Sequence, residues 1–91
     1  MRFIWDSRKA SANVRKHGVT VEEAATVFAD ALALIAEDAL DPARALIIGE
    51  SAGRRILVTV FVEIQARQIR IISARRATSH ERRRYEEGQE G

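Results

Sequence analysis

Arginine is concentrated in one stretch of the chain that could bind phosphate. Residues 70–87, RIISARRATSHERRRYEE, hold six arginines in eighteen positions. A guanidinium group grips a phosphate through two parallel hydrogen bonds, so arginine is favoured where a polyanion is recognised. Arg75 and Arg76 lie where a predicted strand ends and a predicted helix begins, and helix N-terminal amides also attract phosphate. We therefore expect a phosphate at this corner. The further contacts expected are Arg70, Arg82 and Arg83.

The position of Arg70 supports the same interpretation. A regular strand would place Arg70 on one face with Ile72 and Ala74. A guanidinium on such a face is costly to bury unless an anion meets it.

Few side chains in the sequence can move a proton near pH 7. Histidine is the side chain whose ordinary pKa lies nearest to neutrality, which makes His17 a candidate, and Lys16 beside it could stabilise negative charge. His17 also falls at a predicted helix C-terminus, where a cationic imidazole capping free carbonyls is a sufficient structural reason. Tyr85 could donate a proton or stack on a base, but it is also the one large apolar residue of its helix. Trp5 could stack on a base or belong to the core.

Several classes of site are excluded by composition. The chain has no cysteine, so it forms no disulfide and offers no thiolate nucleophile or ligand. Two histidines without carboxylates at ligand spacing do not predict a zinc site. No segment approaches the roughly 20 apolar residues of a membrane helix, and the N-terminus lacks a signal-peptide core. We expect no metal, no cofactor, no membrane association and a cytoplasmic location.

The small net charge of +2 conceals a strong segregation of charge along the chain. Residues 1–19 carry +4 and residues 65–85 carry +6, whereas residues 20–53 carry −6. Segregation of this kind creates a local field stronger than the net charge suggests, and its positive part favours a polyanion.

The N-terminal third is predicted to form a strand and two helices within a single domain of residues 1–91. RFIW reads as a short strand, and Asp6 can cap a helix over SRKASANVRKH that Gly18 ends. Thr20 and Glu23 form a capping-box pattern for a second helix. Its apolar positions recur at helical spacing up to about Asp30.

The rest of the chain is predicted to form four strands and a final helix. The strands are expected over residues 31–37, 45–50, 56–64 and 68–74. Pro42 interrupts regular pairing between the first two. Thr78 and Glu81 repeat the capping-box pattern and open a helix to about Glu87. The order β-α-α-β-β-β-β-α predicts an α+β fold, with a mostly antiparallel sheet covered by the two N-terminal helices.

Two long segments of the sequence resemble a known family. They are IWDSRKASANVRKHGVTVEEAATVFAD, residues 4–30, and IRIISARRATSHERRRYEE, residues 69–87. Their most specific pieces are Trp5-Asp6, Asn13, Lys16-His17-Gly18, Ala24-Ala25, Val27-Phe28, RIISARRAT and Glu81 to Tyr85. In this order they resemble the BrnT family, the toxins of bacterial type II toxin–antitoxin modules.

The resemblance implies a fold and an activity. BrnT proteins are similar in fold to the RelE-type toxins, which are small metal-independent ribonucleases that inhibit translation. The partner implied is a BrnA-type antitoxin with a ribbon-helix-helix DNA-binding domain, which forms a hetero-oligomer with the toxin and neutralises it. On this basis the candidate catalytic residues are Lys16, His17, Arg75, Arg76 and Tyr85. The candidate RNA-binding residues are Trp5, Arg70, Arg82 and Arg83.

Two other functions predict the same electrostatics. A nucleic-acid-binding module without catalysis would use the same arginines for phosphate contacts, and its affinity would fall steeply with salt. An interaction protein would use the basic face to receive an acidic partner. Composition does not separate these functions, and the family resemblance favours the ribonuclease.

Overall fold

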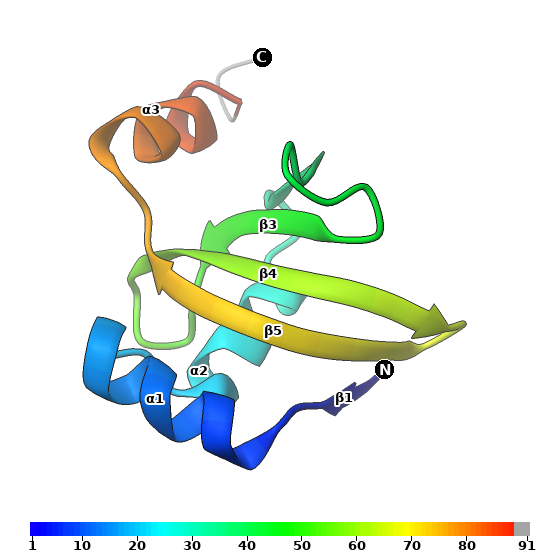
Figure 1. Cartoon of the computed structure of the whole chain (residues 1–91). Helices are drawn as coiled ribbons and strands as arrows, with labels where there is room; N and C mark the ends of the chain where they lie inside the picture. The colour runs from blue at the N-terminus through cyan, green and yellow to red at the C-terminus, as the bar shows by residue number, and fades with distance from the viewer. Residues whose placement is uncertain (89–91) are drawn as a thin grey trace.

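The computed structural model describes residues 1–88 of the chain (Figure 1). Its elements are, in order, β1 (Arg2–Ile4), α1 (Ser7–His17), α2 (Val21–Thr26), the 3-10 helix η1 (Val27–Ala29), β2 (Leu34–Glu37), β3 (Ala45–Glu50), β4 (Ile56–Gln65), β5 (Gln68–Arg76) and α3 (Ser79–Gly88). The order β-α-α-β-β-β-β-α predicted from the sequence is confirmed. Within the described residues, no helix combines the length and the apolar character that crossing a membrane requires.

The helix boundaries follow from capping side chains. The Asp6 carboxylate accepts hydrogen bonds from the amides of Arg8 and Lys9 at 2.9 and 3.0 Å, which starts α1. Gly18 ends α1 in the left-handed region with φ 69°, where a side chain would be strained. The Thr20 hydroxyl accepts from the Glu23 amide at 3.0 Å and starts α2. These three predicted caps are confirmed.

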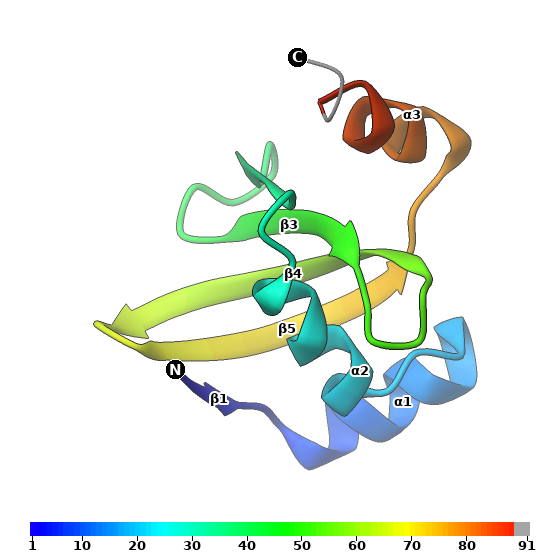
Figure 2. The same cartoon turned by 180° about the vertical axis from the view of Figure 1, so that it is seen from behind.

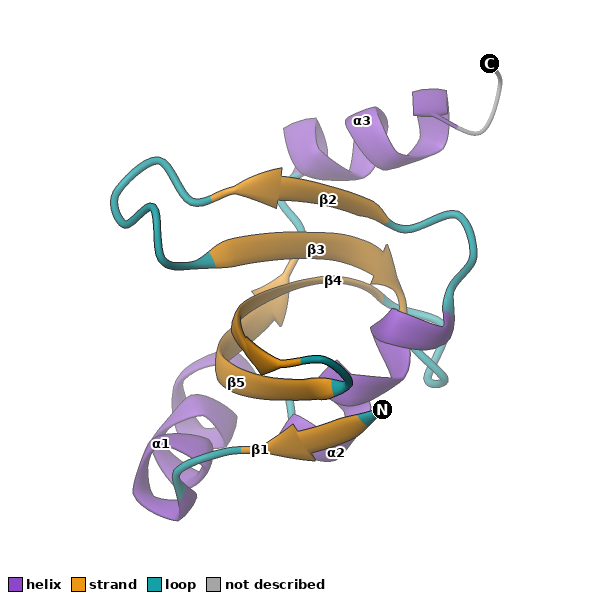
Figure 3. Cartoon of the chain, turned by 90° about the vertical axis from the view of Figure 1, so that its right-hand side faces the viewer, coloured by secondary structure: helices purple, strands orange, loops and turns teal. Residues whose placement is uncertain are grey.

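The strands form one five-stranded sheet in the order β1-β5-β4-β3-β2 (Figure 3). β1 pairs with β5 in parallel, and all other neighbours are antiparallel. The central strand is β4, in agreement with its nearly continuous apolar sequence. The outer strands β1 and β2 are the two edges of the sheet.

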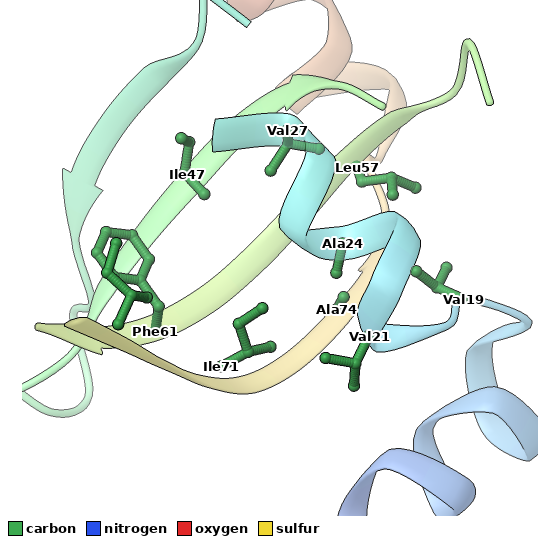
Figure 4. Close-up of a cluster of buried hydrophobic side chains, with 10 residues drawn as sticks. Val19, Val21, Ala24, Val27, Ile47, Leu57, Phe61, Ile71 and Ala74 are labelled. Carbon is green, nitrogen blue, oxygen red and sulfur yellow. The ribbon is translucent and has the colours of Figure 1, made fainter. Parts of the chain in front are cut away.

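The main core lies between one face of this sheet and the N-terminal helical segment. Val19, Val21, Ala24 and Val27 are buried against side chains of the strands (Figure 4). The strand residues that they meet are Ile47, Leu57, Phe61, Ile69, Ile71 and Ala74. Helical spacing on one side and period-two spacing on the other therefore produce this layer, as the sequence predicts.

A smaller core lies on the opposite face of the sheet, beneath the last helix. Tyr85, the one large apolar residue of α3, is the residue that this helix buries there. Tyr85 is 5% exposed and packs with Ile48 and Val58. These two residues alternate with the main-core residues along β3 and β4, so α3 and the N-terminal helices lie on opposite faces of the sheet (Figures 1 and 2).

An irregularity in β5 corrects the predicted face of Arg70. Val60 pairs with Ser73 while Phe61 pairs with Ile71, so one residue of β5 is left out of register. Ala74 consequently lies in the main core with Ile71, and Arg70 is exposed. The Arg70 guanidinium is therefore not desolvated as expected. The sequence pattern did not predict this because it carries no mark of a bulge.

Candidate nucleic-acid interface

Four arginines line one small pocket at the end of the sheet where β5 leads into α3. The pocket has a volume of about 180 Å³. Its lining consists of Arg54, Arg55, Ile56, Arg76, Ala77 and Arg82, and we call it the arginine pocket. Arg54 and Arg55 end the turn between β3 and β4, and Arg76 is the last residue of β5. Antiparallel pairing of Leu57 with Arg76 brings the turn and the strand end together.

One carboxylate fixes Arg55 within this pocket. Glu23 accepts from Arg55 Nε at 2.9 Å and from Arg55 Nη2, and it also accepts from the Ser51 hydroxyl at 2.6 Å. Arg55 Nη2 further donates to the carbonyl of Gly18 at 3.2 Å. The Arg55 bonds lower the pKa of Glu23, an effect that burial opposes and the Ser51 bond reinforces. The pair ties the start of β4 to the junction of α1 and α2.

A second ion pair fixes the link between β5 and α3. Arg75 donates from Nη1 and Nη2 to the two carboxylate oxygens of Glu81, at 2.7 and 2.9 Å. Glu81 also accepts from the Thr78 amide at 2.8 Å, and the Thr78 hydroxyl accepts from the Glu81 amide at 3.2 Å. The second predicted capping box is thus complete. The Arg75 bonds lower the pKa of Glu81 to about 2, against the opposing effect of burial.

Arg54 and Arg76 differ from these paired arginines. Within residues 1–88, neither side chain forms an ion pair or a side-chain hydrogen bond. Arg82 lies 3.5 Å from Glu86, but both side chains are more than 60% exposed, so this pair is worth little. The pocket therefore presents positive charge that the described part of the chain leaves largely uncompensated.

Tyr85 lies in a neighbouring pocket of about 320 Å³ that shares Arg54, Ile56 and Arg82 with the arginine pocket. The Tyr85 hydroxyl donates to the Asp30 carboxylate. Asp30 also accepts from the amides of Glu50 and Leu32, at 2.8 and 2.9 Å. Burial raises the pKa of Asp30, but these three hydrogen bonds outweigh it and leave the pKa below its usual value. Tyr85 is thus close to the arginines, with its hydroxyl held by a carboxylate.

The remaining predicted catalytic residues end helix α1. Lys16 is exposed and His17 is half-buried. The next residue, Gly18, is the one whose carbonyl binds Arg55. The backbone at His17 is therefore tied to the arginine pocket, although neither Lys16 nor His17 lines it.

Three predicted RNA-binding residues lie outside the pocket. Arg70 is six residues before Arg76 on β5, which places it about 20 Å away along the strand. Trp5 is 39% exposed and follows Ile4, the residue that pairs with Arg70. Arg83 is exposed on α3, beside the pocket residue Arg82.

Sequence reasoning missed Arg54, Arg55 and Glu23. Residues 54–64 carry a charge of only +1, so the two arginines do not stand out in a count along the chain. The available signal is that they follow the turn sequence SAG and precede a central strand, whose start lies beside the end of β5 in an antiparallel pair. The capping-box pattern is a sufficient explanation of Glu23 in the sequence. Its ion pair with Arg55, 32 residues away, depends on tertiary structure.

The family model for the ribonuclease toxin BrnT of type II toxin–antitoxin systems matches residues 5–81. The chain belongs to the BrnT family. The crystal structure of the Brucella abortus ribonuclease toxin BrnT superposes with a TM-score of 0.71 at 26% sequence identity. The match covers 87% of this chain and 99% of that one. A comparison with curated proteins gives no match.

These findings confirm the predicted family and the α+β fold of the BrnT type. Membership identifies the chain as a ribonuclease toxin, and a type II system implies a protein antitoxin as its partner. The arginine pocket of this BrnT family member has the charge that binding RNA requires.

Proposed function

We propose that this BrnT family toxin cleaves RNA without a metal ion, with the scissile phosphate bound in the arginine pocket. Cleavage of RNA in the bacterial cytoplasm would inhibit translation. A BrnA-like ribbon-helix-helix antitoxin would neutralise the toxin in a hetero-oligomer. The observation that carries the proposal is the convergence of four arginines on one pocket, two of which have no ion pair within the described residues.

The chemistry proposed is attack of the RNA 2′-hydroxyl on the adjacent phosphorus. The attack releases the 5′-oxygen of the next nucleotide and leaves a cyclic phosphate. Negative charge develops on the phosphate oxygens, and preorganised cations stabilise it. Arg54 and Arg76 would contact these oxygens directly. Arg55 would add charge in a fixed orientation, because Glu23 holds its guanidinium.

The reaction also needs a base for the 2′-hydroxyl proton and an acid for the leaving oxygen. We propose His17 as the base and Lys16 as a cation beside it, since their helix end is tied to Arg55 through Gly18. Tyr85 is the candidate acid, because its pocket shares Arg54 and Arg82 with the arginine pocket. A structural role is supported to the same extent: Tyr85 is buried and its hydroxyl binds Asp30, so the side chain could serve only to anchor α3 to the sheet.

The other predicted residues receive supporting roles. Arg75 would act as a positioning residue, because its guanidinium binds Glu81 and fixes the start of α3. Arg82 would bind a phosphate neighbouring the scissile one. Arg70, Arg83 and Trp5 would contact the RNA on either side of the pocket.

The test is cleavage of RNA by the purified chain in the presence of a chelator. The parent chain is compared with an Arg54→Ala, Arg76→Ala double variant and with Arg2→Ala, an exposed arginine on β1. Removing one donor from a preorganised anion site typically costs about 100-fold in rate, so the double variant should lose at least that factor. Arg2→Ala should cleave as the parent does. Circular dichroism confirms that each variant is folded.

Other outcomes would contradict the proposal. Cleavage that stops with the chelator and returns with Mg²⁺ would refute metal independence. RNA that is bound but stays intact with every variant would identify a binding module without catalysis. Equal cleavage by the parent and the double variant would place the scissile phosphate elsewhere.

A further inference from the structure

A second, larger hollow lies at the other end of the sheet. It has a volume of about 650 Å³, and apolar side chains form its floor, among them Phe28, Ile35, Ile47, Phe61 and Ile69. We call it the apolar groove. It lies on the face of the sheet that carries the main core, at the end where β4 turns into β5.

The groove exists because the N-terminal helices cover only part of this face. α2 and η1 end at Ala29, and the helices lie under the end of the sheet where β4 begins (Figures 1 and 2). The residues beyond are small, since Ala31, Ala33 and Ala45 line the groove. Ile35 is consequently 68% exposed on β2, although it pairs directly with the buried Ile47. An exposed apolar hollow of this kind marks an interaction site.

The charge around the groove is negative. Glu37 and Glu63 line it, and neither carboxylate forms an ion pair within residues 1–88. The one arginine of the lining, Arg44, lies 3.4 Å from Asp41 and is thereby compensated. The groove is therefore opposite in charge to the arginine pocket, and like-charge repulsion disfavours RNA as its ligand.

The groove is also bounded by a free strand edge. β2 is the last strand of the sheet, so the outer side of Leu34–Glu37 has no strand partner within residues 1–88. An edge of this type accepts an extended segment of another protein, whose alternate side chains then enter adjacent pockets. Ile35 stands on this edge with its side chain over the groove.

We propose that the apolar groove is the binding site of the antitoxin, which fills it with a segment of apolar side chains flanked by lysine or arginine. The inference rests on the proposed neutralisation by an antitoxin. Three observations on the described part of the chain support this occupant: the apolar floor, the two carboxylates that form no ion pair there and the edge of β2 that pairs with no strand there. A segment of this composition is attracted to the groove and repelled by the arginine pocket. The antitoxin is thus anchored at the opposite end of the sheet from the RNA site.

The proposal is tested with the purified antitoxin expressed from the reading frame adjacent to the toxin gene. Binding to the full chain is measured by titration calorimetry. Ile35→Lys places a charge against the apolar floor, and we expect it to weaken binding about 100-fold, as for a central anchor. Its exposure means that the fold is retained, which circular dichroism checks. Ile64→Lys is the matched control, since Ile64 is a 45% exposed strand residue outside the groove, and its affinity should equal that of the parent.

Charge is tested with a Glu37→Lys, Glu63→Lys double variant. Reversing both carboxylates should weaken binding of the antitoxin about tenfold and reduce the fall of affinity with salt. In cells that also make the antitoxin, Ile35→Lys should arrest growth where the parent does not, because the toxin escapes neutralisation.

Three outcomes would overturn the inference. Binding lost with Arg54→Ala, Arg76→Ala and kept with Ile35→Lys would place the antitoxin on the arginine pocket. Dimers of the parent chain that Ile35→Lys dissociates would show that a second copy fills the groove. If the parent chain does not bind this antitoxin, both the proposed binding site and the proposed partner are refuted. RNA cleavage by the chain alone is a separate measurement, so a failure there leaves the groove result intact.

Discussion

The two ends of the β4–β5 hairpin are built from the same strands and have opposite properties. At the start of β4 and the end of β5, four arginines surround a small pocket. At the end of β4 and the start of β5, apolar side chains and two carboxylates form a larger groove. About 20 Å of strand separates Arg70, near the second end, from Arg76 at the first.

The acidic residues are used differently at the two ends. Glu23 and Glu81 each hold an arginine and so serve the basic end. Glu37 and Glu63 form no ion pair within the described residues, and they give the groove its negative charge. The segregation of charge in the sequence therefore reappears in the fold, as a basic pocket at one end of the sheet and a groove lined by carboxylates at the other.

The largest difference between the ends should appear in RNA affinity. Removing Arg54 and Arg76 by substitution with alanine takes two cations from the basic end, so single-stranded RNA should bind far more weakly. The slope of log affinity against log salt should fall by about 1.4, at roughly 0.7 for each phosphate that is no longer neutralised. Fluorescence anisotropy at several salt concentrations measures both effects. If the Glu37→Lys, Glu63→Lys double variant also bound single-stranded RNA more weakly, the two ends of the sheet would not differ in RNA binding.

A smaller effect is expected when the support of Arg55 is removed. Glu23→Gln keeps the size of the side chain and removes the charge that orients the guanidinium. Misplacement of a positioned group lowers rate, and we expect RNA cleavage about tenfold slower. Glu22→Gln, an exposed neighbour in the same turn of α2, is the control. Cleavage unchanged in Glu23→Gln would limit the pair to a structural role.

The ion pair at the start of α3 makes stability depend on pH. The pKa of Glu81 is about 2 in the folded chain, against 4.5 for a free glutamate. A lowered folded-state pKa stabilises the protein above pH 4.5, and this stabilisation is lost as the pH falls toward 2. Glu81→Gln should therefore lower the free energy of unfolding by about 2 kcal/mol at pH 7, the size of one hydrogen bond between charged groups. Denaturant titration should show no difference from the parent near pH 2, and Glu86→Gln should show none at either pH.

Tyr85→Phe is expected to have the smallest effect on the fold. It removes the hydrogen bond to Asp30 and keeps the ring that packs with Ile48 and Val58. The free energy of unfolding should fall by about 1 kcal/mol. RNA cleavage by the same variant decides between the two roles of Tyr85. A loss of about 100-fold in a folded variant would identify the proton donor, in keeping with the size of a general-acid contribution.

The fold was predictable where local chemistry determines it. Asp6, Gly18 and Thr20 act on backbone groups within four residues, so their pattern is visible in the sequence. The first of the four predicted strands, residues 31–37, begins only at Leu34, because Asp30 accepts from the Leu32 amide and shapes a turn there. The bulge in β5 is set by its packing, and nothing in the residues themselves marks it.

The site was predictable only in part. Arg76 and Arg82 are predicted and do line the arginine pocket. Arg54 and Arg55 join them through the antiparallel pairing of β4 with β5, which brings distant parts of the chain together. Arg75 is also predicted, but its guanidinium binds Glu81, a partner that the capping-box pattern assigns to the backbone alone. Whether a cation is neutralised inside the fold depends on tertiary geometry.

Asn13 covers a part of β5 that has no neighbouring strand on the β1 side within the described chain. β1 pairs with β5 only up to Arg70, which leaves the rest of that strand beside α1. The Asn13 amide accepts from the Ala74 N–H at 3.1 Å and donates to the Ala74 carbonyl at 2.8 Å. One side chain thus imitates the missing neighbouring strand and masks an edge on which chains could otherwise aggregate. Within residues 1–88, the unpaired edges that remain are the outer sides of β1 and β2, the first of which is only three residues long.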